Sequence, residues 1–362
     1  MKIGFVVGTL GRGGAEKQLV YMLKALNEEG IKTRVLCLTR GEAYEAQIRA
    51  LGVDVDWVGS SSLRAVRLLN IVANVRKNRV DVLQSSHFFT NIYAAAAARR
   101  LGINSIGAIR NDLTSEVSDS RIYGRWHLKL PHHLVANSQM AVTRALALGV
   151  EESRIDLVQN VVDPAVLPKE PRAGASEINL LFVGRLVEQK RPDLFVKLAD
   201  HLIHKFPEKR FNFRVVGVGP LRPRLEKLVV QYGLRADRFS LCGESDDLDQ
   251  IYKETDILVL PSAHEGTPNV ILEAMAHGVP VVATDVGGVP EILSSDCGAL
   301  VDRSSFSQMA EAVSMLVVDA ERRRQMGACG KEYVAAKHSL RFLRRRLTDI
   351  YSRLLNPHSI ND

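Results

Sequence analysis

Two acidic residues eight positions apart, Glu265 and Glu273, stand on either side of a Gly-Thr-Pro-Asn turn in the second half of the chain. An apolar run ends at Leu260, and Pro268 or Asn269 is expected to open a helix after the turn. Amide groups at a helix start attract phosphate, and carboxylates accept hydrogen bonds from sugar hydroxyl groups. The stretch therefore predicts a site for a phosphorylated sugar. Its predicted members are Glu265, Gly266, Thr267, Pro268, Asn269 and Glu273.

A second stretch carries two cations, Arg185 and Lys190, just after an apolar run that ends at Val183. Ligands of open parallel sheets bind beyond the carboxyl ends of the strands, where this stretch is expected to lie. Arg185 can contact two phosphate oxygens and Lys190 supplies a mobile charge, so the pair suits a diphosphate leaving group. Either cation alone would more often be an ordinary surface charge. Gly184, and Gly219 in a later Gly-Val-Gly-Pro turn, complete this predicted donor side.

A glycine-rich loop follows the first apolar run, with Gly13 and Gly14 immediately before a predicted helix. Such a loop lets backbone amides approach an anion at a helix N-terminus, which predicts donor contacts for both glycines. The loop matches neither the GxGxxG nor the P-loop pattern. A tight strand-to-helix turn is an equally good interpretation.

Three polar residues of the first half follow two further apolar runs and are predicted to contact the acceptor or the sugar. They are His87, Arg110 and Asn111. The ordinary alternatives are a hydrogen-bonded loop histidine, and an arginine that pairs with Asp112 or Glu116.

Two series of short β-branched runs alternate with amphipathic stretches, a pattern typical of parallel strands covered by helices. The runs of the first series are residues 2–7, 33–38, 53–58, 80–84 and 105–109. Those of the second series are residues 178–183, 211–216, 239–242, 257–260, 279–283 and 299–301. We therefore predict an α/β fold with two doubly wound, Rossmann-like domains.

A proline-containing stretch, residues 160–176, separates the two series and is the predicted linker. The predicted domains are residues 1–165 and residues 166–337. Residues 338–362 form a tail whose leucines recur at helical spacing. Several arginines within the tail are expected to face solvent, with a membrane or partner contact as the alternative.

The composition is that of a globular protein, with 362 residues, 46% of them apolar and 25% charged. No apolar run approaches the ~20 residues that cross a bilayer, so a cytoplasmic location is expected. The net charge of +7 lies mainly in the first half and would suit an acidic lipid surface, a phosphorylated substrate or nucleic acid. The chain has no basic stretch interleaved with aromatic residues, so no nucleic-acid partner is expected.

The stretches described above resemble the motifs of glycosyltransferase family 4. Glu265 and Glu273, with the Gly-Val-Pro segments that follow them, resemble the EX7E region of that family. Residues 184–190 are similar to its donor-phosphate site, and residues 11–14 to its N-terminal glycine loop. The similarity covers essentially the whole chain.

The resemblance implies a GT-B architecture, in which two Rossmann-like domains face each other and a C-terminal helix crosses back to the first domain. It implies a retaining transferase that needs no metal and no cofactor beside its nucleoside diphosphate sugar, most often a UDP-sugar. Arg185 and Lys190 would hold the diphosphate, Glu273 the ribose, and Glu265 with residues 266–269 the transferred sugar. The implied catalytic residues are Arg185, Lys190 and Glu265. Arg110 stands where many members have a histidine near the sugar.

No metal site and no disulfide is expected. The Asp-Val-Asp triplet of residues 54–56 has the DxD form used by other glycosyltransferases, but it is interpreted as part of a solvated strand. The cysteines form no CxxC pair and are interpreted as small buried residues. They are Cys37, Cys242, Cys297 and Cys329.

We therefore expect an enzyme that transfers a sugar to a glycan or lipid-linked saccharide in cell-surface polysaccharide or lipopolysaccharide biosynthesis. The rival functions are a sugar-nucleotide epimerase of GT-B architecture and a non-catalytic nucleotide-sugar-binding protein. A basic amphipathic stretch, residues 61–79, predicts peripheral contact with an anionic inner membrane. A packed surface helix is the ordinary alternative.

Overall fold

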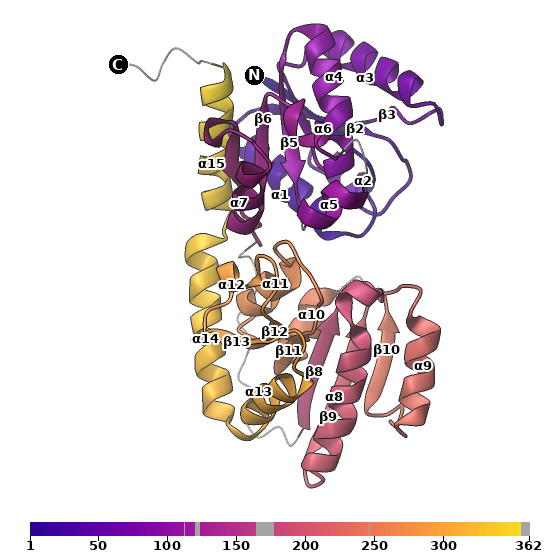
Figure 1. Ribbon diagram of the computed structural model, residues 1–362, viewed down its shortest axis with the longest axis vertical. Helices are drawn as coiled ribbons and strands as arrows, with labels where there is room; N and C mark the ends of the chain where they lie inside the picture. The colour runs from indigo at the N-terminus through magenta and orange to yellow at the C-terminus, as the bar shows by residue number, and fades with distance from the viewer. Residues whose placement is uncertain (112, 120–123, 164–176, 246, 356–362) are drawn as a thin grey trace. The chain divides into compact units, whose positions relative to one another are not determined.

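The computed structural model describes residues 1–111, 113–119, 124–163, 177–245 and 247–355 (Figure 1). The chain divides into two compact units. Unit 1 comprises Met1–Val161 and Ser339–Asp362, and unit 2 comprises Val162–His338. The predicted boundary between residues 165 and 166, and most of the predicted linker, lie outside the described residues.

The described strands of unit 1 form one parallel sheet in the order β3-β2-β1-β4-β5-β6-β7. They are β1 (Lys2–Val7), β2 (Lys32–Cys37), β3 (Asp54–Trp57), β4 (Val82–Ser85), β5 (Asn104–Ile109), β6 (His133–Ala136) and β7 (Ile155–Leu157). The five predicted strands are confirmed within one or two residues at each end. The sequence prediction missed β6 and β7.

Helices cover both faces of this sheet. Apolar side chains of α1 and α15 share one buried cluster with the strands, and those of α3 and α4 share another. The helical segments of unit 1 are α1 (Gly14–Glu28), α2 (Glu45–Ala50), α3 (Arg64–Asn78), η1 (Phe88–Thr90), α4 (Asn91–Leu101), α5 (Leu113–Asp119), α6 (Trp126–Lys129), α7 (Gln139–Ala147), η3 (Glu152–Arg154) and α15 (Leu340–Leu355).

Unit 2 repeats this architecture with a parallel sheet in the order β10-β9-β8-β11-β12-β13. Its strands are β8 (Glu177–Val183), β9 (Arg210–Val216), β10 (Phe239–Gly243), β11 (Ile257–Leu260), β12 (Val281–Thr284) and β13 (Gly298–Val301). Its helical segments are η4 (Glu188–Lys190), α8 (Pro192–Lys205), α9 (Arg222–Gln231), α10 (Leu248–Glu254), α11 (Asn269–Ala276), α12 (Val289–Ile292), α13 (Phe306–Val318) and α14 (Ala320–Lys337). The prediction of two Rossmann-like parallel-sheet domains is confirmed.

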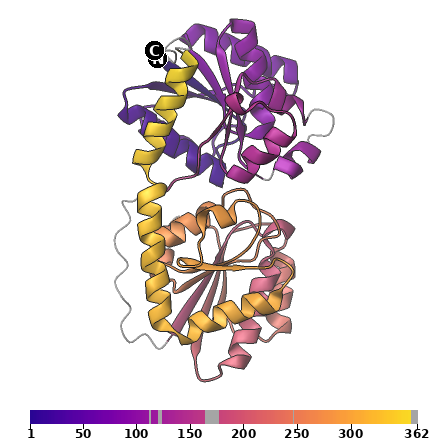
Figure 2. The ribbon, with the colours of Figure 1, turned by 60° about the vertical axis from the view of Figure 1, so that its left-hand side comes forward.

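The C-terminal helix α15 returns to unit 1, as predicted (Figure 2). Its apolar stripe is buried against α1, with Leu347 and Tyr351 almost fully enclosed. Two of its arginines, Arg346 and Arg353, pair with Asp156 of β7 at 2.6 and 2.7 Å. Some of the tail arginines therefore attach the helix instead of only facing solvent.

The cysteines correct one prediction. Cys297 and Cys329 form a disulfide, with their Cα atoms 5.2 Å apart. The pair was missed because 32 residues separate the two cysteines, and only folding brings the segment before β13 against α14. Cys37 is buried as expected, whereas Cys242 is exposed.

Candidate functional site

The donor-side residues of unit 2 follow two neighbouring strands, β8 and β11. Both strands are parallel, so their carboxyl ends meet at one edge of the sheet. The loop after β8 leads through η4 to Lys190, and the loop after β11 leads through Glu265 to α11. The fold therefore brings together two stretches that lie about 75 residues apart in the sequence.

Lys190 and Glu265 are in direct contact at this edge. The Lys190 ammonium donates a hydrogen bond to Glu265 Oε1 at 2.5 Å, and both side chains are largely buried. The Gln189 side chain donates to the His264 carbonyl at 2.9 Å, which joins the two loops a second time. A cation and a carboxylate thus lie side by side, able to contact a phosphate and a sugar hydroxyl group respectively.

Gly287 lets the Glu265 loop sit this close. Its φ of +59° lies in the left-handed region, and a Cβ there would collide with the Glu265 carbonyl oxygen. Gly219 has a similar role, because its Cβ would collide with the Leu186 carbonyl oxygen of the loop after β8. Gly219 therefore permits a close backbone approach beside the candidate site.

Glu273 lies within α11 and is almost fully buried. The Tyr252 hydroxyl donates a hydrogen bond to Glu273 Oε2 at 2.9 Å. Burial, and then the adjacent Glu273 carboxylate, raise the pKa of Tyr252, so this hydroxyl stays protonated and remains a donor. The ring of His277 packs on Tyr252 with centroids 5.1 Å apart. The Glu273 carboxylate is therefore held by a rigid, buried partner.

The other predicted donor-side residues lie near Lys190, Glu265 and Glu273 in the sequence and take the following positions. Helix α11 begins at Asn269 after Pro268, as predicted, and Pro268 provides no side-chain cap. Arg185 is exposed, and its side chain makes no hydrogen bond or ion pair with the residues that the structure describes. A Cβ added at Gly184 would lie in van der Waals range of the Lys190 methylene groups. The other residues of the turn are Gly266, which accepts a hydrogen bond from the Gly288 amide at 2.8 Å, and the buried Thr267.

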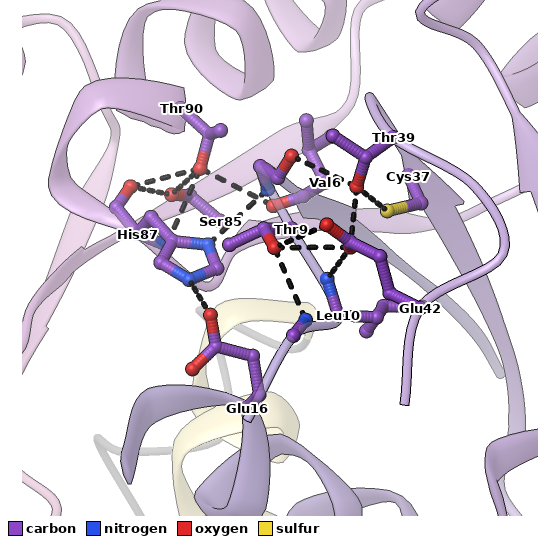
Figure 3. Close-up of polar contacts among 12 residues, drawn as sticks. Val6, Thr9, Leu10, Glu16, Cys37, Thr39, Glu42, Ser85, His87 and Thr90 are labelled. Atoms are coloured by element: carbon purple, nitrogen blue, oxygen red, sulfur yellow. Dashed lines mark hydrogen bonds and ion pairs between the residues drawn. The ribbon is translucent and has the colours of Figure 1, made fainter. Parts of the chain in front are cut away.

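The Glu42 carboxylate holds the glycine loop of unit 1 in place through hydrogen bonds (Figure 3). Glu42 accepts hydrogen bonds from the Thr9 and Thr39 hydroxyls and from the Leu10 amide. Burial alone would raise the pKa of Glu42, but these three donors outweigh it and lower the pKa. The carboxylate is therefore ionised at neutral pH and fixes the start of the loop.

His87 links this loop to α1 (Figure 3). Its Nδ1 accepts from the Gly8 amide at 3.2 Å, so the Nε2 atom carries the proton. Nε2 then donates to Glu16 Oε1 at 3.0 Å. Gly13 lies against the same carboxylate, because a Cβ at Gly13 would collide with Glu16 Oε2. The structure thus places His87 beside Gly13 and next to an acid.

The Arg110 side chain contacts a different residue of unit 1 from those around His87. Its guanidinium contacts the sulfur of Met22 at 3.4 Å, and burial lowers its pKa to about 10. Among the described residues no carboxylate lies within ion-pair distance of it, so the alternative pairing with Glu116 is not formed. Asn111 is half-buried beside it. The structure does not show Arg110 in contact with the cluster around His87.

The chain matches two family models. Residues 12–166 match the model described as Glycosyltransferase Family 4, and residues 177–319 match Glycosyl transferases group 1. An uncharacterised glycosyltransferase of Methanocaldococcus jannaschii is 33% identical over 269 residues, which cover 72% of each protein. The chain belongs to glycosyltransferase family 4.

Two further similarities concern a relative and a solved structure. An Escherichia coli glycosyltransferase named for colanic acid biosynthesis is 30% identical over 222 residues, 58% of this chain and 49% of its own length. This family 4 chain spans about half the length of several of the curated relatives it matches. The crystal structure of Anabaena HepE with UDP-glucose is 18% identical, covers 97% of this chain and 99% of its own, and has a TM-score of 0.86. That likeness shows the fold alone.

Three residues of this family 4 protein make hydrogen bonds at the candidate sites but had no role in the sequence prediction. They are Glu16, Glu42 and Tyr252. Glu16 directly follows the glycine loop, so its position was a usable signal. Glu42 lies more than 30 residues from Thr9 and Leu10, and Tyr252 lies 21 residues from Glu273, so no local pattern marks these contacts.

The DxD triplet of this family 4 chain is part of an ion-pair cluster. Asp54 and Asp56 both pair with Arg34 of the neighbouring strand β2. Within the described ranges no group of three or more His, Cys, Asp or Glu side chains is arranged to hold a metal ion. The same ranges contain no helix long and apolar enough to span a bilayer.

Proposed function

We propose that the protein transfers a sugar from a nucleoside diphosphate sugar, most simply a UDP-sugar, to a hydroxyl group of a glycan or lipid-linked acceptor. The observation that carries the proposal is the contact between Lys190 and Glu265 at one sheet edge, with Glu273 buried in the helix that follows. Membership of glycosyltransferase family 4 and the fold shared with a UDP-glucose-bound neighbour support it.

The chemistry follows from the charge that develops during transfer. Cleavage of the bond between sugar and phosphate leaves negative charge on the diphosphate, while the sugar becomes cation-like. Lys190 and the exposed Arg185 stabilise the leaving diphosphate, and Glu265 then accepts a hydrogen bond from the transferred sugar. Glu273 accepts hydrogen bonds from the ribose hydroxyls. These residues supply the charges that the step requires, so the proposal includes no metal and no further cofactor.

The proposed stereochemistry is retention. If the leaving phosphate oxygen accepts the acceptor's proton on the same face of the sugar, no separate strong base is needed. Product analysis by NMR tests this proposal: an anomeric configuration opposite to that of the donor contradicts it.

We propose that the acceptor is presented at a cell-surface polysaccharide assembly site on the inner membrane, which the E. coli relative named for colanic acid biosynthesis supports. Helix α3 adds a second observation. Leu63 before it and Leu69 within it are about two-thirds exposed, and Arg64 is exposed beside them. Apolar and basic side chains on one exposed helix suit an anionic lipid surface. Equal sedimentation with neutral and anionic liposomes contradicts this contact.

A panel of nucleoside diphosphate sugars tests the central proposal. We expect at least one UDP-sugar to raise the melting temperature of the full chain and to release UDP when an acceptor is added. The donor alone is the control: an epimerised sugar nucleotide formed without transfer identifies the protein as an epimerase. Binding without either reaction identifies a non-catalytic binding protein.

A further inference from the structure

The Cys297–Cys329 disulfide of unit 2 has no part in the transfer chemistry proposed above. Cys297 lies between α12 and β13, and Cys329 lies within α14. Cys297 is buried, whereas Cys329 is only half-buried. The bond joins two elements of unit 2, and each of them touches a segment of the candidate donor site.

Helix α14 packs closely on α11, the helix that carries Glu273. A Cβ added at Gly327 would collide with the Gly278 carbonyl oxygen just after α11, and one added at Gly330 would lie 3.1 Å from an α11 side chain. Cys329 lies between these two glycines in the sequence. The disulfide is therefore attached to α14 at the point where its backbone meets α11.

Helix α12 contacts the loop that carries Glu265. The Gly288 amide, at the start of α12, donates a hydrogen bond to the Gly266 carbonyl oxygen at 2.8 Å. The Tyr333 hydroxyl of α14 donates to the Glu291 carbonyl oxygen of α12 at 3.0 Å. The disulfide attaches the segment after α12 to the same helix α14. It thereby supports the segments of both candidate acids.

The two sulfur atoms of the disulfide differ in their surroundings. The Ser294 hydroxyl donates a hydrogen bond to Cys297 Sγ at 3.3 Å, and Ser294 itself is exposed. When a thiolate attacks one sulfur of a disulfide, the other leaves as a thiolate, and it leaves faster when a hydrogen bond lowers its pKa. The geometry therefore favours attack on the half-buried Cys329, with Cys297 as the leaving group.

We infer that this disulfide is a redox-modification site, at which reduction by a dithiol lowers the activity of the donor site. The inference rests on the proposed transfer reaction and adds its regulation. One thiolate of the dithiol attacks Cys329 Sγ, the S–S bond breaks and Cys297 leaves as a thiolate. The second thiolate of the dithiol then displaces Cys329. The dithiol gives up two electrons and becomes a disulfide, and the two cysteine thiolates take up the two protons that it releases.

Reduction acts on the Glu265 loop through α12. In the reduced chain no covalent bond attaches the segment after α12 to α14, so this segment moves more freely. The hydrogen bond between Gly288 and Gly266 transmits the movement to the Glu265 loop. A displacement of about 1 Å near a reacting group lowers turnover about 100-fold. The oxidised chain is therefore the active form.

Initial transfer rates of the full chain before and after reduction test the inference. The reductant is dithiothreitol, glutathione disulfide reverses the reaction, and alkylation with mass spectrometry counts the reduced cysteines. We expect reduction to lower kcat with the UDP-sugar about tenfold or more, at a temperature at which both forms stay folded, and reoxidation to restore it. An unchanged kcat in the fully reduced chain overturns the inference. So does a disulfide that dithiothreitol leaves intact in the folded chain.

Cys242→Ser is the matched control, because Cys242 is an exposed cysteine outside the disulfide. The kcat of this variant should fall on reduction as that of the wild type does. The double variant C297S/C329S should have a low kcat that dithiothreitol does not change. A double variant with the kcat of the oxidised wild type overturns the inference.

Ser294→Ala tests the role of Cys297 as the leaving group. We expect dithiothreitol to reduce S294A about threefold or more slowly than the wild type, with an unchanged kcat in the oxidised form. Ser295→Ala is the control, because Ser295 is equally exposed and makes no hydrogen bond to either cysteine within the described ranges. Equal reduction rates of S294A and S295A would overturn the proposed direction of attack.

Hydrogen exchange of the wild type separates this inference from the proposed function. The backbone amides of residues 264–267 should exchange about threefold faster or more after reduction, whether or not a donor sugar has been identified, and those of α9 should not change. A chain that transfers no sugar in either redox state contradicts the proposed function, while the exchange result still decides the inference. Unchanged exchange at residues 264–267 overturns it.

Discussion

Lys190 and Glu265 illustrate how single residues define the candidate donor site. The two side chains neutralise each other in a contact with little solvent, so each must exchange that contact for a substrate group when a diphosphate sugar binds. For Lys190 the phosphate replaces one negative partner with another, whereas the buried Glu265 carboxylate loses its cation and needs a hydrogen-bond donor in its place. In the proposed reaction, a hydroxyl group of the donor sugar provides that hydrogen bond to Glu265.

Lys190→Ala should lower turnover by about 30-fold to 1,000-fold, because loss of one oriented charge contact commonly costs ~2–4 kcal/mol in the transition state. Initial rates with saturating UDP-sugar measure this. Lys227→Ala, on the exposed surface of α9, is the matched control and should keep the wild-type rate. Equal rates for the two variants would mean that Lys190 has another role.

Tyr252→Phe should weaken UDP binding about tenfold with little change in kcat, because the variant loses the hydroxyl that orients Glu273. Calorimetry with UDP and with 2′,3′-dideoxy-UDP measures the effect. The wild type should prefer UDP strongly, and this preference should shrink in Y252F. Tyr232→Phe is the control, since no hydrogen bond of the Tyr232 hydroxyl occurs among the described residues. If Y252F keeps the wild-type preference for UDP, Glu273 does not bind the ribose hydroxyls.

Neighbouring parallel strands position these residues. The loops after β8 and β11 meet because the two strands pair, and Gly217, Gly219 and Gly287 allow the backbones to approach. Apolar runs in the sequence predicted both strands, but they could not predict which strands are neighbours. The sheet order is decided by how helices pack on the two faces, which involves residues far apart in the chain.

Gly287→Ala should reduce turnover about 100-fold while the protein still folds. The added Cβ would lie 1.8 Å from the Glu265 carbonyl oxygen, so the Glu265 loop must shift by about 1 Å. The strained φ alone costs about 1–2 kcal/mol of stability. Gly233→Ala is the control, since Gly233 has a similar φ of +62° and no neighbour within 4 Å of an added Cβ. Melting temperatures of both variants measure the cost of the strained φ. Initial rates of both variants measure the effect of displacing the Glu265 loop, which only Gly287→Ala causes. Equal rates would exclude a role for the Gly287 contact.

The whole molecule is a chain that leaves unit 1 near Val161 and returns to it at Ser339. The return depends on α15, whose apolar stripe and Asp156 contacts attach it to unit 1. Asp156 is also held by His133 at 2.8 Å. Burial alone would raise the pKa of Asp156, but the His133 hydrogen bond and the two arginines outweigh it and lower the pKa.

Asp156→Asn should destabilise the protein by about 2 kcal/mol at pH 7, below the ~3–5 kcal/mol of a fully buried pair, because Arg346 and Arg353 are more than a third exposed. A lowered carboxyl pKa contributes stability above the unfolded value of about 3.9 and loses it as the pH falls through the folded value. The difference in melting temperature between the variant and the wild type should therefore shrink towards pH 3.

Asp349→Asn is the control for this pair of measurements. Asp349 contacts the same two arginines but is about half exposed, so its loss should cost less than ~1 kcal/mol. Equal destabilisation by the two variants, or a difference that does not depend on pH, would contradict the buried role of Asp156.

The sequence by itself determined the fold class, eleven of the strands described here and the return of the C-terminal helix, and it predicted the residue types of the candidate donor site. Local patterns in the sequence, namely apolar runs, helical spacing and short motifs, predict each of these features. Tertiary structure alone decided the contacts of Lys190 with Glu265 and Glu16 with His87, the Cys297–Cys329 disulfide and the inward orientation of Arg110. Those pairs lie 32 to 88 residues apart, and hydrophobic packing of whole strands and helices, which no local pattern encodes, sets which of them meet.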